Sequence, residues 1–430
     1  MKVKTRIAPS PTGYMHVGTA RTALFNYLFA KQNHGEFLLR IEDTDIARSK
    51  PEYEVDITNG LEWLGLNWDG GIVRQSERIE IYKKYADKLV NSGKAQKVES
   101  EKGVAIIFTI PAYKEIIFKD EVLRASIGFK SSDPENIVLI KSDGNPAYNF
   151  AVVVDDHEMD ITDVIRGQDH TSNTHKQVEL IEALEFKRPR YAHLPLILAT
   201  DRSKLSKRHG AVSVNEFTKL GYLPEAMLNF LALIGWHPKD NREIFNLDDL
   251  IKEFDISRVQ ISGAVFDNKK LDSINNHYIK NMVPAEIAKF IAPYLDMYDP
   301  NEAQLIKVAH LFRDRLNIFS EIKELAGFIF ALPVYETDLL NWKESPKEKT
   351  KENLETVLAI LENMPENSFD IDTTTTELMP KANDIGRGDL LWPLRVALSG
   401  LAKSPSPFEI LDVLGKKESV RRIKLAIDKI

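Results

Sequence analysis

The sequence contains no cysteine among its 430 residues. Disulfide bridges and thiolate metal ligands are therefore excluded. No apolar run approaches the roughly 18 residues of a membrane span, and residues 1–6 lack the apolar segment of a signal peptide. These absences fit a cytoplasmic protein.

The sequence also lacks an excess of positive charge, since its net charge is −7. A nucleic-acid partner would have to meet a local basic patch, and composition alone predicts no RNA binding. Internal repeats and low-complexity stretches are absent as well. With 43% hydrophobic and 28% charged residues the chain can bury several cores, and its length fits about three domains as a prior.

The first part of the chain has the pattern of an α/β fold. Residues 4–8 indicate a short strand, residues 20–28 carry apolar side chains at helical spacing, and residues 36–42 indicate a second strand. Gly35 stands where a helix C-terminus favours glycine. This order favours parallel pairing with a right-handed crossover, and residues 51–64 add another helix.

This α/β pattern is interrupted once and then gives way to helices. Short β-like runs separated by turn residues, at 104–110, 114–118 and 137–141, indicate an insertion. The α/β pattern then returns, with a helix over 173–184 and an apolar strand over 194–199. Helical spacing dominates the rest of the chain, as at 226–234 and 286–294, and residues 342–353 form a surface helix or linker.

The loop between the first strand and the first helix carries residues suited to phosphate binding. His16, Val17, Gly18 and Thr19 stand at the entry to the helix, whose unpaired N–H groups and positive dipole end receive phosphate. Gly18 lets a nucleotide approach the backbone closely, and His16 can donate a hydrogen bond to a phosphate oxygen. The segment is neither a G-x-G-x-x-G fingerprint nor a Walker loop, and a structural turn with an incidental histidine would give the same short pattern.

A second cluster follows the strand predicted at 194–199. Lys204, Lys207, Arg208 and His209 place four basic or potentially basic side chains in one short loop, enough to neutralise a triphosphate. Lysines suit a mobile loop that closes on pyrophosphate, because each is a point charge on a flexible stem. Taken alone, a solvated basic loop is the alternative.

Together the two clusters resemble the signatures of class I aminoacyl-tRNA synthetases. Residues 16–19 are similar to the H-I-G-H signature and residues 204–208 to K-M-S-K-S, in the same order on either side of a split α/β domain. Thr19 replaces the second signature histidine, a departure that is normal in the glutamyl branch. Further segments resemble bacterial-type glutamyl-tRNA synthetases over most of the chain: residues 6–13, 19–24, 39–45, 65–69, 148–150, 164–167 and 393–398.

This resemblance implies a fold and a division into domains. The expected fold is an α/β Rossmann-like catalytic domain with an inserted α+β acceptor-binding domain, followed by all-α C-terminal anticodon-binding domains. The expected segments are the first catalytic half (1–75), the insertion (76–142), the second catalytic half with the basic loop (143–222), a helical stem-contact region (223–280) and a helical anticodon-binding region (281–430).

The resemblance also implies a reaction. The enzyme would activate L-glutamate with ATP to glutamyl-adenylate and transfer the glutamyl group to the 3′ end of tRNA(Glu), with tRNA(Gln) also open. Mg²⁺ would accompany the ATP phosphates, and we expect a monomer. Many bacterial relatives carry cysteine zinc ligands in the insertion, but the corresponding residues here, roughly 93–118, include no cysteine, so we expect no structural zinc. A non-catalytic tRNA-binding regulatory paralogue is the competing interpretation, against which the intact His16, Gly18, Lys204 and Lys207 weigh. A general nucleotidylyltransferase would not account for the long helical half.

A glutamate ligand has one cationic and two anionic groups, so its pocket needs a carboxylate and at least one arginine. Glu42, at the end of a strand, can take the α-amino group, and Arg6, at the end of the first strand, can bind the side-chain carboxylate. For an isolated arginine the alternative is a salt bridge to Asp43, Asp45 or Asp169.

The remaining site residues come from the resemblance. It adds Tyr148 and Arg166 to the glutamate pocket, with Ala8 and Ser10 lining it. The catalytic residues that it implies are His16, Gly18, Lys204 and Lys207. The nucleotide contacts that it implies are His16, Gly18, Thr19, Asp169, Ile197, Lys204, Ser206, Lys207 and Arg208.

The helical back half would read the anticodon, where unstacked bases can be contacted. Its last basic side chains could touch RNA phosphates or form a solvated helix face: Lys416, Lys417, Arg421, Arg422 and Lys424.

Overall fold

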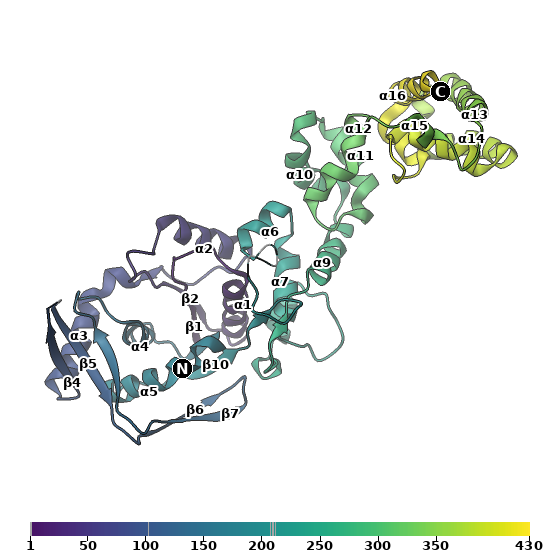
Figure 1. The fold of residues 1–430 in the computed structure, drawn as a ribbon. Coiled ribbons are helices and arrows are strands. Elements are labelled where there is room, and N and C mark those ends of the chain that lie inside the picture. Colours follow the sequence, from purple (N-terminus) through teal and green to yellow (C-terminus); the bar gives the residue numbers. More distant parts are fainter. Residues whose placement is uncertain (1, 102, 207, 209, 211) are drawn as a thin grey trace. The chain divides into compact units, whose positions relative to one another are not determined.

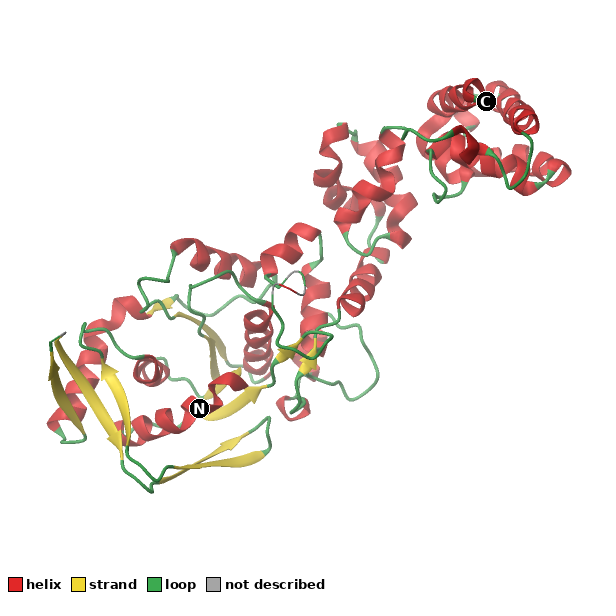
Figure 2. Cartoon of the chain, in the orientation of Figure 1, coloured by secondary structure: helices red, strands yellow, loops and turns green. Residues whose placement is uncertain are grey.

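The computed structural model describes residues 2–430 with the exception of 102, 207, 209 and 211. The chain divides into two compact units, Met1–Ile274 and Asn275–Ile430, which are described separately (Figure 1). In the part of the chain that the structure describes, the strands lie in the first unit and the second is helical (Figure 2). The predicted fold class, an interrupted α/β part followed by a helical part, is confirmed.

Parallel strands form the centre of the first unit. β1 (Lys4–Ile7), β2 (Glu36–Ile41) and β3 (Val73–Arg74) pair in that order, and β9 (Asp163–Gly167) pairs with β10 (Arg190–Leu194). The residue before β9 donates its backbone N–H to the first residue of β1 at 3.0 Å, so these two strands start side by side. The carboxyl ends of the strands therefore meet at one edge, where ligands of open parallel sheets bind.

The first helix, α1 (Val17–Gln32), packs on β1 and β9. Asn33 is its C-cap, and the residue in the left-handed conformation after it is His34, with a φ of 52°. The prediction that Gly35 terminates the helix was therefore wrong in detail. Glycine is required there for another reason, because a Cβ on Gly35 would lie 2.2 Å from the carbonyl oxygen of Val3.

The insertion holds two β structures. β4 (Ala95–Ser100), β5 (Gly103–Ile110) and β8 (Glu135–Ile140) form an antiparallel sheet. β6 (Glu115–Asp120) and β7 (Ala125–Lys130) form a hairpin, which a parallel pairing of its Asp120 with Tyr191 joins to β10. Three of these strands match the predicted runs. β4 was not predicted, because its side chains are mostly exposed and show no apolar alternation. β7 was not predicted either, although Ala125, Ile127 and Phe129 alternate with polar residues and glycine in it.

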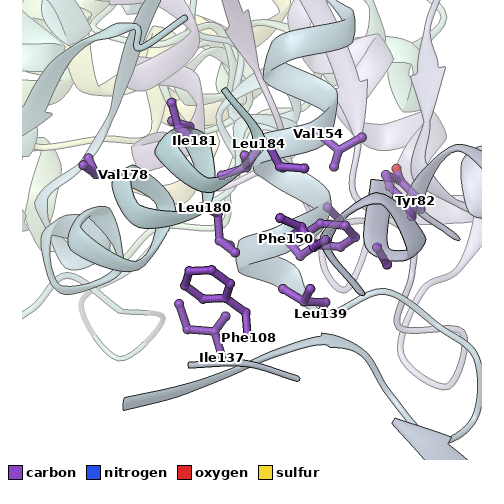
Figure 3. Packing of buried hydrophobic residues seen from close by; sticks show 14 of the residues in the cluster. Tyr82, Phe108, Ile137, Leu139, Phe150, Val154, Val178, Leu180, Ile181 and Leu184 are labelled. Carbon is purple, nitrogen blue, oxygen red and sulfur yellow. The ribbon is translucent and has the colours of Figure 1, made fainter. Parts of the chain in front are cut away.

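A buried apolar cluster holds the insertion against the catalytic part (Figure 3). It combines side chains of α3 (Ile79–Asn91), α4 (Tyr148–Glu158) and α5 (Thr171–Leu184) with those of β5 and β8. Burying each large apolar side chain contributes roughly 1.5–3 kcal/mol. The cluster therefore fixes α4 and α5, which carry residues of the site described below. Labelled members are Tyr82, Phe108, Ile137, Leu139, Phe150, Val154, Val178, Leu180, Ile181 and Leu184.

One predicted strand was wrong. Residues 194–199 do not form a single strand, because β10 ends at Leu194 and Pro195 follows. Proline lacks the N–H that a continuing ladder needs. The chain then enters β11 (Ile197–Leu198), which pairs with β12 (Ala264–Val265) in a different sheet.

The remaining helices complete both units. Those of the first unit are α2 (Pro51–Trp63), α6 (Val214–Leu220), α7 (Pro224–Leu233), α8 (Leu247–Glu253) and, across the boundary, α9 (Asn268–Lys280). The second unit contains α10 (Pro284–Leu295), α11 (Glu302–Phe312), α12 (Ile322–Phe330), α13 (Lys347–Asn363), α14 (Ile371–Ile385), α15 (Arg387–Ser399) and α16 (Pro407–Lys429). None of the described helices is both long and apolar enough to span a membrane.

Arg422 on α16 is a structural residue of the second unit. Its side chain is 1% exposed, and its Nη1 donates to the carbonyl oxygens of Phe328 and Leu398 at 2.7 and 2.6 Å. Its Nε donates to Glu418 at 2.7 Å. The suggestion that Arg422 reaches RNA phosphates is therefore wrong, because the side chain is enclosed by the helix ends that it joins.

Candidate active site

A cleft of about 390 Å³ lies at the carboxyl ends of β1, β2 and β9. Its walls bring together residues that are far apart in the sequence. All but two of the predicted site residues that the structure describes line it: Arg6, Ala8, Ser10, His16, Gly18, Thr19, Glu42, Tyr148, Arg166, Asp169, Ile197 and Lys204. The lining does not include Ser206 and Arg208, and Lys207 lies outside the described residues.

His16 is the N-cap of α1 and lines this cleft. Its Nδ1 accepts the backbone N–H of Gly18 at 3.1 Å, so in the neutral ring the proton resides on Nε2. Burial, assisted by the nearby charge of Lys204, lowers the pKa of His16. The side chain is thereby held as a neutral donor, beside the unpaired N–H groups of the helix start.

The first lysine of the basic loop is anchored beside the cleft. Lys204 forms an isolated antiparallel bridge with Leu198 of β11, and the backbone N–H of Leu205 donates to the carbonyl oxygen of Ile197 at 3.3 Å. Farther along, Arg208 donates to the hydroxyl of Ser203 at 3.0 Å. Lys204 therefore contributes a positive charge to the same end of the cleft as His16.

The other end of the cleft contains a buried network of charges. Arg6 donates two hydrogen bonds to Asp156, of 3.0 and 3.3 Å, and Arg40 donates to the same carboxylate at 2.7 Å. Arg40 also donates to Glu42 at 3.1 Å. Although burial raises it, the pKa of Asp156 is lowered by the two arginines. Asp156 is thus the ionised partner that they share.

Glu42 responds differently to the same surroundings. Burial raises the pKa of Glu42, and the opposing effects of Arg40 and Arg6 do not cancel that shift. The carboxylate is therefore less well compensated than Asp156. A cation entering the cleft beside Glu42 would supply the positive charge that Arg40 and Arg6 do not fully provide.

Arg166 brings an uncompensated positive charge to this wall. Its Nε donates to Nε2 of His193 at 3.2 Å and its Nη2 donates to Thr174 at 2.8 Å, whereas no carboxylate in the described part of the chain forms an ion pair with it. Its buried Nη1 has no hydrogen-bond partner among the described residues. Burial lowers the pKa of Arg166, a shift that a bound anion would oppose.

Tyr148 closes the same wall from the first turn of α4. Its hydroxyl lies 2.9 Å from Nδ1 of His170, a residue that the sequence did not indicate. Desolvation raises the pKa of Tyr148 to about 12, so the phenol stays protonated.

The alternative interpretation of Arg6 and Arg166, a salt bridge to Asp43, Asp45 or Asp169, was wrong. Arg6 pairs with Asp156 instead, and Arg166 forms no ion pair with a carboxylate in the described part of the chain.

Sequence reasoning missed the charged residues behind the wall. Arg40 and Asp156 were not selected because one lies within an apolar strand and the other follows an apolar helical run. What could have indicated them is that each is a charged residue at a position that the apolar pattern predicts to be buried. Fully buried His193 gave a related signal, a polar side chain within a buried strand.

Comparisons with known proteins identify the family. Residues 2–103 and 96–273 match the family described as class I tRNA synthetases (E and Q), catalytic domain, and residues 286–427 match the anticodon binding domain. The glutamate–tRNA ligase of Aquifex aeolicus is 40% identical over 100% of this chain and 99% of its own length. Glutamate–tRNA ligase 2 of Thermoanaerobacter pseudethanolicus is 38% identical over 99% of the chain and 98% of its own length.

Solved structures give the same result over the whole chain. A glutamate tRNA ligase from Elizabethkingia meningosepticum, solved in complex with its amino acid, has a TM-score of 0.89 at 29% identity, covering 100% of this chain and 99% of the other. The glutamate–tRNA synthetase of Elizabethkingia anophelis has a TM-score of 0.88 at 30% identity, covering 100% of both chains. With full-length relatives at this level of identity, the chain belongs to the glutamate–tRNA ligases of the class I aminoacyl-tRNA synthetases.

Proposed function

We propose that the cleft binds L-glutamate and ATP side by side and joins them as glutamyl-adenylate before transfer to tRNA. Family membership makes glutamate–tRNA ligation the reaction of this chain. The observation that supports the assignment of residues is the division of charge in the cleft. Arg166 stands there without an anionic partner among the described residues, whereas His16, the N-cap of α1, and Lys204 line the cleft close to each other.

The glutamate end is assigned to Arg6, Glu42, Tyr148 and Arg166, with Ala8 and Ser10 lining it. Glu42 receives the α-ammonium group, whose charge relieves the poorly compensated carboxylate. The two arginines receive the carboxylates. Glutamine carries a neutral amide instead, which leaves a buried guanidinium without its anion, and this is how the pocket rejects it.

The ATP end is assigned to the start of α1 and to the basic loop. Thr19, Asp169 and Ile197 flank the nucleotide, and His16 donates its Nε2–H to a phosphate. Mg²⁺ enters with the phosphates as part of the substrate, as is usual for nucleotide sites. Lys207, which lies outside the described residues, is assigned to the transition state with Lys204, and Ser206 and Arg208 belong to the same loop.

The chemistry needs no nucleophile from the protein. An oxygen of the glutamate α-carboxylate attacks the α-phosphorus of ATP, and pyrophosphate leaves. A hydroxyl of the terminal ribose of tRNA then attacks the activated carbonyl, and AMP leaves. Catalysis therefore consists of positioning and of stabilising charge that develops on the phosphate.

The second unit is assigned to the anticodon of tRNA(Glu), because residues 286–427 match an anticodon binding domain. We further propose that the enzyme acts as a cytoplasmic monomer and needs no structural zinc.

The test is glutamylation of purified tRNA(Glu) and tRNA(Gln) by the full chain, with ATP and Mg²⁺ at saturation. We expect ATP-dependent glutamylation of tRNA(Glu), and a sharp loss in the Lys207→Ala variant without loss of folding. Pyrophosphate exchange with and without tRNA tests the competing interpretation of a non-catalytic tRNA-binding paralogue. Tight tRNA binding without exchange or glutamylation would favour that paralogue.

A further inference from the structure

A hydrogen-bonded chain connects the inserted hairpin to the wall of the cleft. Asp120, the last residue of β6, lies 2.6 Å from Nδ1 of His193, measured from its Oδ2. On the opposite side of the imidazole ring, Nε2 accepts the Nε–H of Arg166 at 3.2 Å. Asp120 and His193 are both fully buried, so water does not compete for these contacts.

The carboxylate of Asp120 is held on both of its oxygens. Oδ1 accepts the backbone N–H groups of Val122 and Leu123 at 3.0 and 2.8 Å. Oδ2 accepts the backbone N–H of His193 at 3.1 Å in addition to the ring contact. Because these N–H groups all donate to it, the Asp120 carboxylate acts here as an acceptor. Nδ1 of His193 must therefore carry the proton.

This tautomer determines what Nε2 can do. A neutral ring with its proton on Nδ1 presents a lone pair on Nε2, and that lone pair accepts from Arg166. Burial lowers the pKa of His193, although the hydrogen bond to Asp120 opposes the shift, and the neutral form is favoured. The opposite tautomer would place Nε2–H against the Nε–H of Arg166, so Arg166 would lose its acceptor and Nε2–H could turn only to the hydroxyl of Thr174, 3.1 Å away.

The contacts of Arg166 define which part of its guanidinium is left for a ligand. Nε is engaged by His193, and Nη2 donates to Thr174 at 2.8 Å. Nη1 is buried and has no hydrogen-bond partner among the described residues. The edge of the guanidinium that carries Nε and Nη2 is thus fixed. Nη1 is the donor that remains for a ligand, and Arg166 itself lines the cleft.

We propose that Asp120 and His193 are positioning residues for glutamate recognition, with Asp120 setting the tautomer of His193 and His193 setting the guanidinium of Arg166. This inference rests on the proposed function, in which Arg166 binds a carboxylate of the substrate. The inserted hairpin then contributes to amino-acid selection without touching the amino acid. The alternative is a purely structural role for Asp120 in the turn that contains Val122 and Leu123.

The first experiment is Asp120→Asn in the full chain, measured by glutamylation of tRNA(Glu). An amide nitrogen facing Nδ1 would donate to it and drive the proton to Nε2. We expect the KM for glutamate to rise about 10-fold or more, with the KM for ATP and kcat changed far less. The matched control is Glu179→Gln, which neutralises another buried carboxylate paired with an inserted residue, Lys114, at 2.6 Å. It should leave the KM for glutamate unchanged.

The second experiment separates positioning from structure. In His193→Gln, the amide oxygen can accept from Arg166 without any tautomer to set. We expect the KM for glutamate to remain near that of the unaltered enzyme, and we expect Asp120→Asn to have little further effect on it in this background. His193→Leu, which has no acceptor, should raise the KM for glutamate as Asp120→Asn does.

The outcomes separate the two proposals. An unaltered chain that does not glutamylate tRNA overturns the proposed function itself. An active chain in which Asp120→Asn raises the KM for glutamate equally in both backgrounds, or raises the KM for ATP as much, overturns the positioning role. Should Asp120→Asn fail to fold, the comparison of His193→Gln with His193→Leu decides, and equal KM values for these two variants overturn the inference.

Discussion

One carboxylate oxygen of Asp156 receives hydrogen bonds from Nε of Arg6 at 3.0 Å and from Nη1 of Arg40 at 2.7 Å. Arg6 and Glu42 both line the cleft, whereas Arg40, which is not part of the lining, donates to Glu42. A single acid on α4 therefore supports both the residue assigned to a substrate carboxylate and the residue assigned to the substrate ammonium group. Disturbing Asp156 should affect recognition of both groups together.

We predict that Asp156→Asn raises the KM for glutamate more than the KM for ATP and lowers the stability of the fold. Removing one partner from a buried ion pair costs about 3–5 kcal/mol, because the remaining charges stay buried. Glutamylation kinetics and chemical denaturation of the same preparation measure both effects. Asp163→Asn, which loses an ion pair of 2.7 Å with Arg190 outside the cleft lining, is the control. A KM for glutamate that is equally raised in the control would contradict the prediction.

The two functions of His16 can be separated by two substitutions. His16→Ala removes both the N-cap and the Nε2 donor, and a lost cap costs roughly 0.5–2 kcal/mol. His16→Asn keeps a good capping oxygen but loses the imidazole Nε2–H, because the shorter amide cannot place a donor at the same point. We expect His16→Asn to unfold close to the unaltered chain while its kcat falls about 10²–10³-fold, the usual effect of removing one donor from developing charge. Near-normal turnover in His16→Asn would contradict a role in phosphate stabilisation.

The same residue predicts a pH dependence of stability. Burial and Lys204 lower the pKa of His16 in the folded chain below its ordinary value of 6.5. The unfolded chain therefore binds the proton more readily, and stability must rise with pH in this window. The contribution of His16 is fully present above pH 6.5 and is lost as the pH falls through the lowered pKa. Denaturation curves from pH 7.5 to 5 should show this slope in the unaltered chain and a weaker one in His16→Asn.

The parts of the molecule that the sequence predicted are those governed by local patterns. Periodicity located β1, α1 and β2, and the two short motifs predicted residues that line one cleft. The order of strands and helices was sufficient for the parallel sheet. Positions such as Arg6 and Glu42 could be selected because they follow or end strands, where α/β folds expose functional side chains.

The parts that the sequence did not reveal depend on contacts between distant segments. Asp120 and His193 are 73 positions apart, and nothing local indicates that they share a hydrogen bond. Edge strands such as β4 carry no apolar alternation, so only their pairing with β5 identifies them. Pro195 ended a strand within an apolar run that otherwise favours continuation.

The assignment of Arg6 to glutamate and Lys204 to ATP predicts opposite kinetic effects. Arg6→Ala should raise the KM for glutamate about 10- to 100-fold, since a hydrogen bond to a charged group contributes about 1.5–3 kcal/mol. Lys204→Ala should instead raise the KM for ATP or lower kcat, with little effect on the KM for glutamate. Each variant is the control for the other. Equal effects of both variants on both substrates would contradict the division of the cleft.

We predict that Glu418 makes an acid-sensitive contribution to the stability of the second unit. The pKa of Glu418 is lowered from an ordinary value of 4.5 to about 2. The hydrogen bond from Arg421 is the main cause, and Arg422 adds to the effect. Because the folded pKa is lowered, the stabilisation is present above pH 4.5 and is lost as the pH falls towards 2. The pair is partly exposed, so solvent and salt reduce the contribution. Glu418→Gln should therefore flatten the acid limb of a stability curve measured between pH 5 and 3, whereas Glu362→Gln, which removes an exposed pair with Lys424, should not. An acid limb that is the same in both variants would show that Glu418 titrates without effect on folding.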